Sequence, residues 1–324
     1  MTVPASDHFN GLHFFDPDGA PPKPLREVLR WQFSGKRQRA AWPDWAPSPH
    51  ADTPPERVDG GKARLSFVGH ASWLIQAGGL NILVDPVWSS RVSPVGFAGP
   101  KRHNDPGIAF EKLPKIDVVL VSHGHYDHLD IATLSRLAKN FAPRVVTPLG
   151  NDVTMRSTDS SIKAEAFDWH DRVELGGGIA VHLVPTRHWT ARGLFDRNKA
   201  LWASFVLETP AGKIYVVCDF RLWRWQTFSP RRGEARAVTP GDPPDRRLRA
   251  ALVHARPAHE SGRCREGAAR LRRAGRARAS SRHFPADGRG DRRTCESAGR
   301  GAGCRADSAA AVSVAMKPGQ VVEI

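Results

Sequence analysis

The sequence has few cysteines and no long apolar run. Its four cysteines, at positions 218, 264, 295 and 304, form no C-x-x-C pair, which in a chain of 324 residues excludes a disulfide framework and favours a reducing compartment. No run of about 18 apolar residues is present, so no membrane-spanning helix is predicted. The start, MTVPASDHFNGLHFF, lacks the basic and apolar stretches of a secretory signal. We therefore expect a soluble, cytoplasmic protein.

Lysine is absent from residues 221–310, which contain 22 arginines against 9 acidic residues, a net charge of +13. The first 220 residues hold 25 basic and 23 acidic side chains, so this segment accounts for most of the net charge of +15. It shows no sustained helical or strand period. Basic segments of this kind occur in proteins that bind nucleic acid or anionic membranes.

Composition divides the chain into four parts. Residues 1–60 form an N-terminal arm rich in Pro, Trp and Arg, with a helix predicted over residues 24–42. Residues 61–220 contain short apolar runs cut by turns, which is typical of strands. Residues 221–312 are the Arg-rich segment, in which we predict no core, and residues 313–324 form a separate C-terminal end.

The part over residues 61–220 predicts an α/β fold. The runs RLSFVG, SWLIQA, LNILV and IDVVLV predict strands, and LDIATLSRLAKNF predicts a helix. Further strands are predicted in RVVTPL, VELGGGIAVHLV and ALWASFVLETPAGKIYVV, with a hairpin turn at TPAGK. Strands interrupted by helices favour an α/β sandwich whose functional residues lie on loops at strand ends.

A cluster of metal-ligand residues follows one of these strands. In VLVSHGHYDHLD, His123, His125, Asp127 and His128 follow the pattern H-x-H-x-D-H. Imidazole and carboxylate groups are ligands suited to Zn²⁺, and two ions sharing one water can produce a nucleophile at neutral pH. A histidine-rich surface loop that binds nothing is the alternative. The position directly after an apolar strand favours a metal site.

Four other residues lie at the ends of predicted strands. His188 in VPTRHWTARG and Asp219 in YVVCDF could face the same sheet edge, although each taken alone is typical of a cap or a surface group. Asp85 in LVDP could orient a ligand histidine from behind, or form a turn. His70 in FVGHAS is expected to be a hydrogen-bonded core histidine and not a ligand.

Three stretches carry a family resemblance. SFVGHASWLIQAGGLNILVDPVWSSRVSPVGFAGPKR, LPKIDVVLVSHGHYDHLD and RHWTARGLFDRNKALWASFVLE resemble the N-acylphosphatidylethanolamine phospholipase D-like branch of the metallo-β-lactamase superfamily. The resemblance covers about residues 20–220, with H-x-H-x-D-H shared by the superfamily and the flanking motifs specific to the branch. It implies an αββα sandwich that hydrolyses phosphodiesters. A related branch opens phosphorylated lactones, so a lactonase-like hydrolase stays open.

The resemblance also implies two zinc ions. In the resemblance, His123, His125 and His188 bind the first ion. Asp127 and His128 bind the second ion, and Asp219 bridges both. A hydroxide held by these ligands would attack the phosphorus, and no separate catalytic residue is implied. The expected partner is a small-molecule or lipid phosphodiester, which leaves peripheral membrane contact open, whereas nucleic acid is not expected. The oligomeric state is not indicated.

The chain departs from the family after Asp219. The family continues with T/S-G-F/Y, where this chain has Phe220 and Arg221, and a late histidine in H-x-G-T-F-x-L-T-D-E is missing, so the second zinc site is expected to be impaired. Deleting one base from permitted codons after Asp219 encodes Asp-Ser-Gly-Phe-Gly-Asp-Gly, as in the family. The same shift yields family-like segments from position 258 and over 281–292.

We therefore hypothesise that residues 220–312 are out of frame and that the frame returns before VAMKPGQVVEI, which resembles the end of the family's sequences. A genuine basic tail is the alternative. In that case the chain could be a non-catalytic binder of nucleic acid or anionic membranes, and its binding would weaken steeply with salt.

Overall fold

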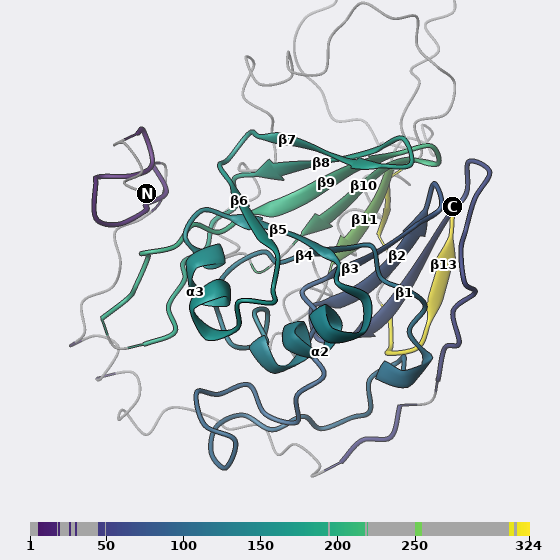
Figure 1. The fold of residues 1–324 in the computed structure, drawn as a ribbon, viewed down its shortest axis with the longest axis horizontal. Coiled ribbons are helices and arrows are strands. Elements are labelled where there is room, and N and C mark those ends of the chain that lie inside the picture. Colours follow the sequence, from purple (N-terminus) through teal and green to yellow (C-terminus); the bar gives the residue numbers. More distant parts are fainter. Residues whose placement is uncertain are drawn as a thin grey trace, which may run out of the picture.

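The protein is a sandwich of two β-sheets, with helices on the outer face of one sheet (Figure 1). The computed structural model describes residues 6–17, 19, 26, 30, 45–48, 50–193, 195–217, 219, 250–254, 311–313 and 316–324. The helix predicted over residues 24–42 and most of the Arg-rich segment lie outside the described residues. Among the described helices, none is long and apolar enough to cross a membrane.

The first sheet has seven strands in the order β13-β1-β2-β3-β4-β5-β6. They are β1 (Ala63–Gly69), β2 (Ser72–Ala77), β3 (Leu80–Val84), β4 (Val118–Leu120), β5 (Arg144–Pro148), β6 (Ala164–Phe167) and β13 (Val321–Glu323). Strands β13 to β3 are antiparallel, whereas β3 to β6 are parallel. The parallel pairing brings the carboxyl ends of β3 and β4 to the same edge, where ligand sites in such sheets commonly form.

The second sheet has six strands in the order β12-β11-β10-β9-β8-β7. They are β7 (Arg172–Gly176), β8 (Ile179–Val184), β9 (Ser204–Thr209), β10 (Gly212–Val217), β11 (Ala250–His254) and β12 (Ala311–Ser313). Strands β7 to β10 pair antiparallel, and β11 and β12 continue the sheet in parallel. The sequence predicted no strand in the Arg-rich segment, so β11 is a strand that the sequence analysis missed.

Two apolar layers stabilise the sandwich. On β3, Ile82 and Val84 face the other sheet, while Leu83 between them faces the helices, because successive side chains of a strand point to opposite faces. The layer between the sheets includes the fully buried Trp202 and Phe205 from the second sheet side. Burial on both faces explains why the central strands are continuous apolar runs.

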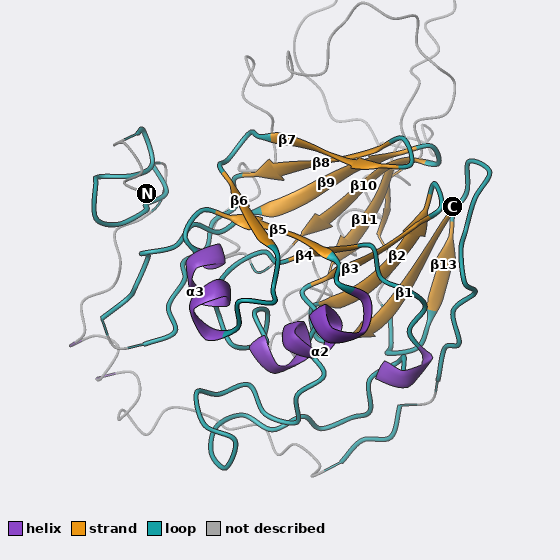
Figure 2. Cartoon of the chain, viewed as in Figure 1, coloured by secondary structure: helices purple, strands orange, loops and turns teal. Residues whose placement is uncertain are grey.

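The helices lie on the outer face of the seven-stranded sheet, as Figure 2 shows. They are α2 (Ile131–Phe141), α3 (Asn151–Thr158) and the short 3₁₀ turn η1 (Phe110–Lys112). The sequence predicted α2 and the hairpin between β9 and β10, and both are confirmed. It did not predict α3 or β6. The expected α/β sandwich class is confirmed, with one of the two helical layers present among the described residues.

Asp130 caps α2 directly after the H-x-H-x-D-H stretch. Its carboxylate accepts hydrogen bonds from the backbone N–H of Thr133 at 3.2 Å and from the Thr133 hydroxyl at 2.6 Å. It also accepts from the backbone N–H of Ser89 at 3.0 Å and from the Ser89 hydroxyl at 2.9 Å. A side chain that caps a helix and holds a neighbouring loop fixes where the motif ends.

Replacing Asp130 with alanine should lower the free energy of unfolding by about 2 kcal/mol, because the cap and the partly buried hydrogen bonds to Ser89 are lost together. Urea unfolding followed by circular dichroism measures this change. Glu111→Ala is the matched control, since Glu111 is an exposed carboxylate on η1 and should change stability by less than about 0.5 kcal/mol. Equal effects of the two substitutions would contradict the capping role.

Candidate metal centre

The H-x-H-x-D-H residues lie on a tight turn between β4 and α2. The backbone N–H of His128 donates to the carbonyl of His125 at 3.1 Å, which folds the loop back on itself. The hydroxyl of Thr190 accepts from the backbone N–H of Gly124 at 3.0 Å and ties the loop to the second sheet side. His123 and His128 are buried, whereas His125 and Asp127 are partly exposed. All four side chains therefore lie at the edge where β3 and β4 end.

Three histidine nitrogens converge at this edge. Nε2 of His123 and Nδ1 of His125 are 2.8 Å apart, and Nε2 of His188 lies 3.1 Å from the former and 3.2 Å from the latter. Ligand nitrogens around a tetrahedral zinc ion are about 3.3 Å apart, given zinc–nitrogen bonds of about 2.0–2.1 Å. The three lone pairs face one another, so a cation between them fits this group.

Burial favours the neutral, ligating form of these imidazoles. Burial lowers the pKa of His123 well below its ordinary value, and the neighbouring histidines lower it further. Burial also lowers the pKa of His188 to about 3. Protons therefore compete weakly for these nitrogens at neutral pH.

Asp127 and His128 belong to a second group. Nδ1 of His128 donates to Asp85 at 2.7 Å, while its buried Nε2 has no hydrogen-bond partner among the described residues. Burial opposes the charged imidazolium, but the Asp85 and Asp127 carboxylates outweigh burial and raise the pKa of His128 well above its ordinary value. Burial likewise opposes the Asp127 carboxylate, yet His128 and His70 lower the pKa of Asp127 below its usual range. A cation would satisfy the unpartnered Nε2 of His128 in place of the proton that these carboxylates favour there.

Asp219 follows β10 and lies between the two groups. Its Oδ2 is 3.6 Å from Nε2 of His128 and 4.0 Å from Nε2 of His188. Burial raises the pKa of Asp219, but His128 and His188 outweigh burial and lower it to about 2. The carboxylate thus faces one histidine of each group, the position that a bridging ligand requires. The structure brings together all six residues that the family resemblance implies as ligands.

Asp85 orients His128 directly and His123 through Ser122. It lies at the end of β3, fully buried, and accepts hydrogen bonds from the Ser122 hydroxyl at 2.6 Å and from His128 at 2.7 Å. Since Ser122 gives its hydroxyl proton to Asp85, its oxygen accepts from Nδ1 of His123 at 2.9 Å. Protons on both Nδ1 atoms leave Nε2 of His123 and of His128 free to bind a metal.

His70 corrects the sequence analysis. It is hydrogen-bonded, as expected, but its partner is Asp127 at 3.0 Å, and its side chain is 35% exposed and not part of the core. It occupies the short turn between β1 and β2 with a left-handed φ of 54°. In the sequence, the only sign was a histidine between Gly69 and Ala71 at a predicted turn. A local pattern of this kind cannot reveal a contact with Asp127.

Arg192 is a second residue that the sequence analysis missed. Its Nη1 donates to the carbonyls of Gly124 at 2.9 Å and Leu129 at 2.8 Å, and its guanidinium lies 4.0 Å from the centre of the Tyr126 ring. The Arg192 side chain therefore holds both ends of the H-x-H-x-D-H loop, called the metal loop below. The RHWTARG motif that contains His188 also supplies this arginine.

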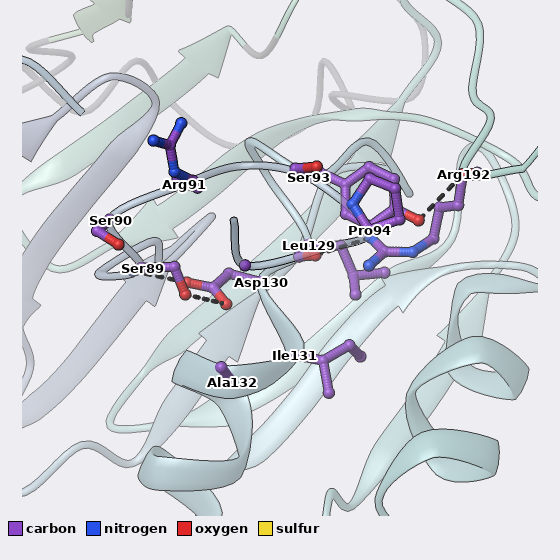
Figure 3. Close-up of a pocket in the computed structure, with 12 residues that line it drawn as sticks. Ser89, Ser90, Arg91, Ser93, Pro94, Leu129, Asp130, Ile131, Ala132 and Arg192 are labelled. Atoms are coloured by element: carbon purple, nitrogen blue, oxygen red, sulfur yellow. Dashed lines mark hydrogen bonds between the residues drawn. The ribbon is translucent and has the colours of Figure 1, made fainter. Parts of the chain in front are cut away.

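A pocket of about 340 Å³ adjoins the metal loop (Figure 3). It is lined by Tyr126 and Leu129 of the loop, by the 89–96 segment and by Arg192. Arg91 and Arg192 belong to opposite sides of the lining in Figure 3. Arg91, Arg192 and three serine hydroxyls supply donors that suit an anionic group, while the Asp130 carboxylate, which also lines the pocket, accepts hydrogen bonds from Ser89 and Thr133.

A two-sheet sandwich with helices outside and a His/Asp cluster at one sheet edge defines the metallo-β-lactamase fold class. The family described as beta-lactamase superfamily domain matches residues 80–284, more than half of the chain. The chain therefore belongs to the beta-lactamase superfamily, and the resemblance found in the sequence is confirmed at this level. The match extends beyond residue 220, where the resemblance found in the sequence ends.

Several curated relatives are similar over part of their length. An uncharacterized protein of Mycobacterium tuberculosis is 36% identical over 198 residues, covering 60% of this chain and 52% of that protein. The N-acyl-phosphatidylethanolamine-hydrolyzing phospholipase D 1 of Caenorhabditis elegans is 35% identical over 163 residues, covering 48% and 46%. The chain thus spans about half the length of these relatives. Its lineage includes hydrolases.

Among solved structures, Igni18, a metallo hydrolase from Ignicoccus hospitalis, is similar with a TM-score of 0.37. The two sequences are 16% identical, and the match covers 50% of this chain and 63% of Igni18.

Replacing Asp85 with asparagine should weaken metal binding about 10- to 100-fold. One carboxylate oxygen accepts from both the Ser122 hydroxyl and His128, and the other accepts from the Ser122 backbone N–H, so the NH₂ of an amide would face a donor at one of these places. Competition with a chromogenic chelator measures the affinity. Asp52→Asn is the matched control, since Asp52 is also buried but pairs with Arg64 on β1. If both substitutions leave metal affinity unchanged, Asp85 does not support the ligands.

Proposed function

We propose that this protein is a zinc-dependent hydrolase that cleaves phosphodiesters, with a phospholipid as the substrate class. The observation that carries the proposal is the convergence of two His/Asp groups, joined by Asp219, at one edge of the sandwich. His123, His125 and His188 would hold one zinc ion. Asp127 and His128 would hold the other, and Asp219 would be shared.

The donor set supports zinc. Imidazole nitrogen with carboxylate oxygen is a borderline set that suits Zn²⁺, and the spacing of the three nitrogens matches tetrahedral coordination. Bound zinc ions lower the pKa of a coordinated water to near neutrality and stabilise negative charge on phosphoryl oxygens. The surrounding residues orient these ligands, since Asp85 fixes two imidazoles and Arg192 fixes the loop.

The adjoining pocket supports an anionic substrate. Arg91 and Arg192 line it together with the Tyr126 segment of the metal loop, so a phosphate-bearing group held there lies beside the loop that carries the ligands. The nematode relative is named for the hydrolysis of N-acyl-phosphatidylethanolamine, a phospholipid with one phosphodiester. We extend the phosphodiester class to this chain on these two grounds.

His125→Ala and Asp127→Asn should each reduce phosphodiester hydrolysis more than roughly 100-fold, because each removes a ligand group from the metal centre. Release of phosphatidic acid from N-acyl-phosphatidylethanolamine in mixed micelles measures the activity. A chelator should abolish it, and added zinc should restore it. His182→Ala is the control, since His182 on β8 faces Glu208 and belongs to neither group.

A phosphorylated lactone serves as the competing substrate. Hydrolysis of the lactone without any cleavage of the phosphodiester would replace this proposal with the lactonase alternative. Activity that survives both ligand substitutions would reject metal-dependent hydrolysis altogether.

Two exposed phenylalanines support a substrate at a lipid surface. Phe97 is 85% exposed and follows Gly96, which lines the pocket, while Phe195 is 86% exposed and lies three residues after Arg192. Exposed aromatic rings beside arginines are typical of surfaces that contact phospholipid bilayers. We therefore extend the proposal to peripheral contact with an anionic phospholipid surface through these two loops.

The double substitution Phe97→Ser with Phe195→Ser should reduce binding to phosphatidylglycerol-containing vesicles at least about 10-fold, because two large apolar groups no longer enter the interface. Vesicle sedimentation measures the binding. Leu12→Ser is the control, since Leu12 is equally an exposed apolar side chain (73%) but lies on the N-terminal arm. Hydrolysis of a water-soluble phosphodiester should stay unchanged. Equal vesicle binding by the double variant and the wild type would contradict the docking surface.

A further inference from the structure

We propose that His70 is a direct ligand of the second metal ion, which gives that ion a complete set of protein ligands within the part of the chain that the structure describes. This inference rests on the proposed two-ion centre. It assigns a role to a histidine that the sequence analysis placed in the core, and it removes the need for a later histidine.

The distances place His70 among the ligands. Its Nε2 is 3.0 Å from Oδ2 of Asp127, close to the spacing of about 3.3 Å between neighbouring ligand atoms of a tetrahedral ion. The ligand atoms of His70, Asp127 and His128 all lie within 4.8 Å of one another. The ring of His70 meets the ring of His128 edge-on, with centroids 5.6 Å apart. The same arrangement of converging atoms occurs in the first group.

The backbone holds His70 in this place. β1 and β2 pair closely up to Gly69 and Ser72, which leaves His70 and Ala71 to make the turn. His70 adopts a left-handed φ of 54°, and Gly69 before it has a φ of 136°. A left-handed φ is uncommon for residues other than glycine, although histidine adopts it more readily than most, and some such residues occur at functional sites.

The count of ligands is compatible with this role. Without His70, the second ion would have one imidazole, from His128, with the carboxylates of Asp127 and Asp219. With His70 it would have two imidazoles and two carboxylates, so that a coordinated water would be a fifth ligand, a number that catalytic zinc can also take. The first ion then has three imidazoles and shares Asp219.

A positioning role is the rival explanation, in which His70 only donates a hydrogen bond to Asp127 and orients it. Two substitutions separate the roles. His70→Gln keeps an N–H donor at similar reach but offers a poor zinc ligand. His70→Glu offers a good ligand at similar reach but no donor for Asp127. His170→Gln is the matched control, because His170 is an exposed histidine with a left-handed φ of 72° and belongs to neither ligand group.

The test measures zinc content after equilibrium dialysis of the full-length chain and its variants. We expect two zinc ions in the wild type, in His70→Glu and in His170→Gln, and one in His70→Gln. A second readout needs no variant: ring nitrogen resonances of the wild type, assigned through the backbone, should show Nε2 of His70 shifting to a metal-bound position as the second equivalent of zinc is added.

Two ions in His70→Gln would overturn the inference, and so would a failure of His70→Glu to hold the second ion. An unshifted His70 resonance at two equivalents would also overturn it, whether or not the variants fold. These outcomes leave the proposed hydrolase intact if the wild type holds two ions. A wild type that holds only one ion overturns the inference alone, whereas a wild type that binds no zinc rejects the proposed function itself.

Discussion

The buried carboxylate of Asp85 is the interaction on which the rest of the site depends. A carboxylate without solvent is unfavourable unless its oxygens accept hydrogen bonds, and Asp85 accepts from the Ser122 backbone N–H at 2.7 Å, from the Ser122 hydroxyl and from His128. These bonds join the end of β3 to the first residues after β4. They also fix the protonated nitrogen on His128 directly and on His123 through Ser122. One charge therefore sets the register of two strand ends and the orientation of one imidazole in each group.

The sandwich explains how ligands far apart in the sequence meet. The parallel pair β3 and β4 supplies Asp85 and the H-x-H-x-D-H loop from the first sheet, while the segment after β8 supplies His188 and the end of β10 supplies Asp219 from the second. Between the sheets, a continuous apolar layer holds these edges together. The site therefore needs both sheets, and its geometry depends on their packing as much as on the loop.

The sequence predicted the local features and missed those made by long-range contacts. The helical period over residues 129–141 and the apolar runs were sufficient for α2 and most strands, whereas α3 has only eight residues and its weak apolar pattern gave no signal. The four residues of H-x-H-x-D-H were recognisable because they are adjacent. His70 lies 57 residues from its partner Asp127, and Arg192 lies 68 residues from Gly124, so no local spacing could reveal either contact.

The same geometry bears on the Arg-rich segment. All seven groups that converge at the sheet edge, including His70, come from residues 70–219, whereas the described C-terminal residues pair with β1 through β13 and pack on the core. The hypothesis that residues 220–312 are out of frame concerns residues that lie largely outside the described part of the chain and stays a prediction.

If His70 completes the second ion's ligands, the ligand set of the centre no longer depends on whether that segment is in frame, because all the ligands precede the segment. The segment then matters through the sheet: β11 extends the second sheet beside β10, the strand that ends two residues before Asp219.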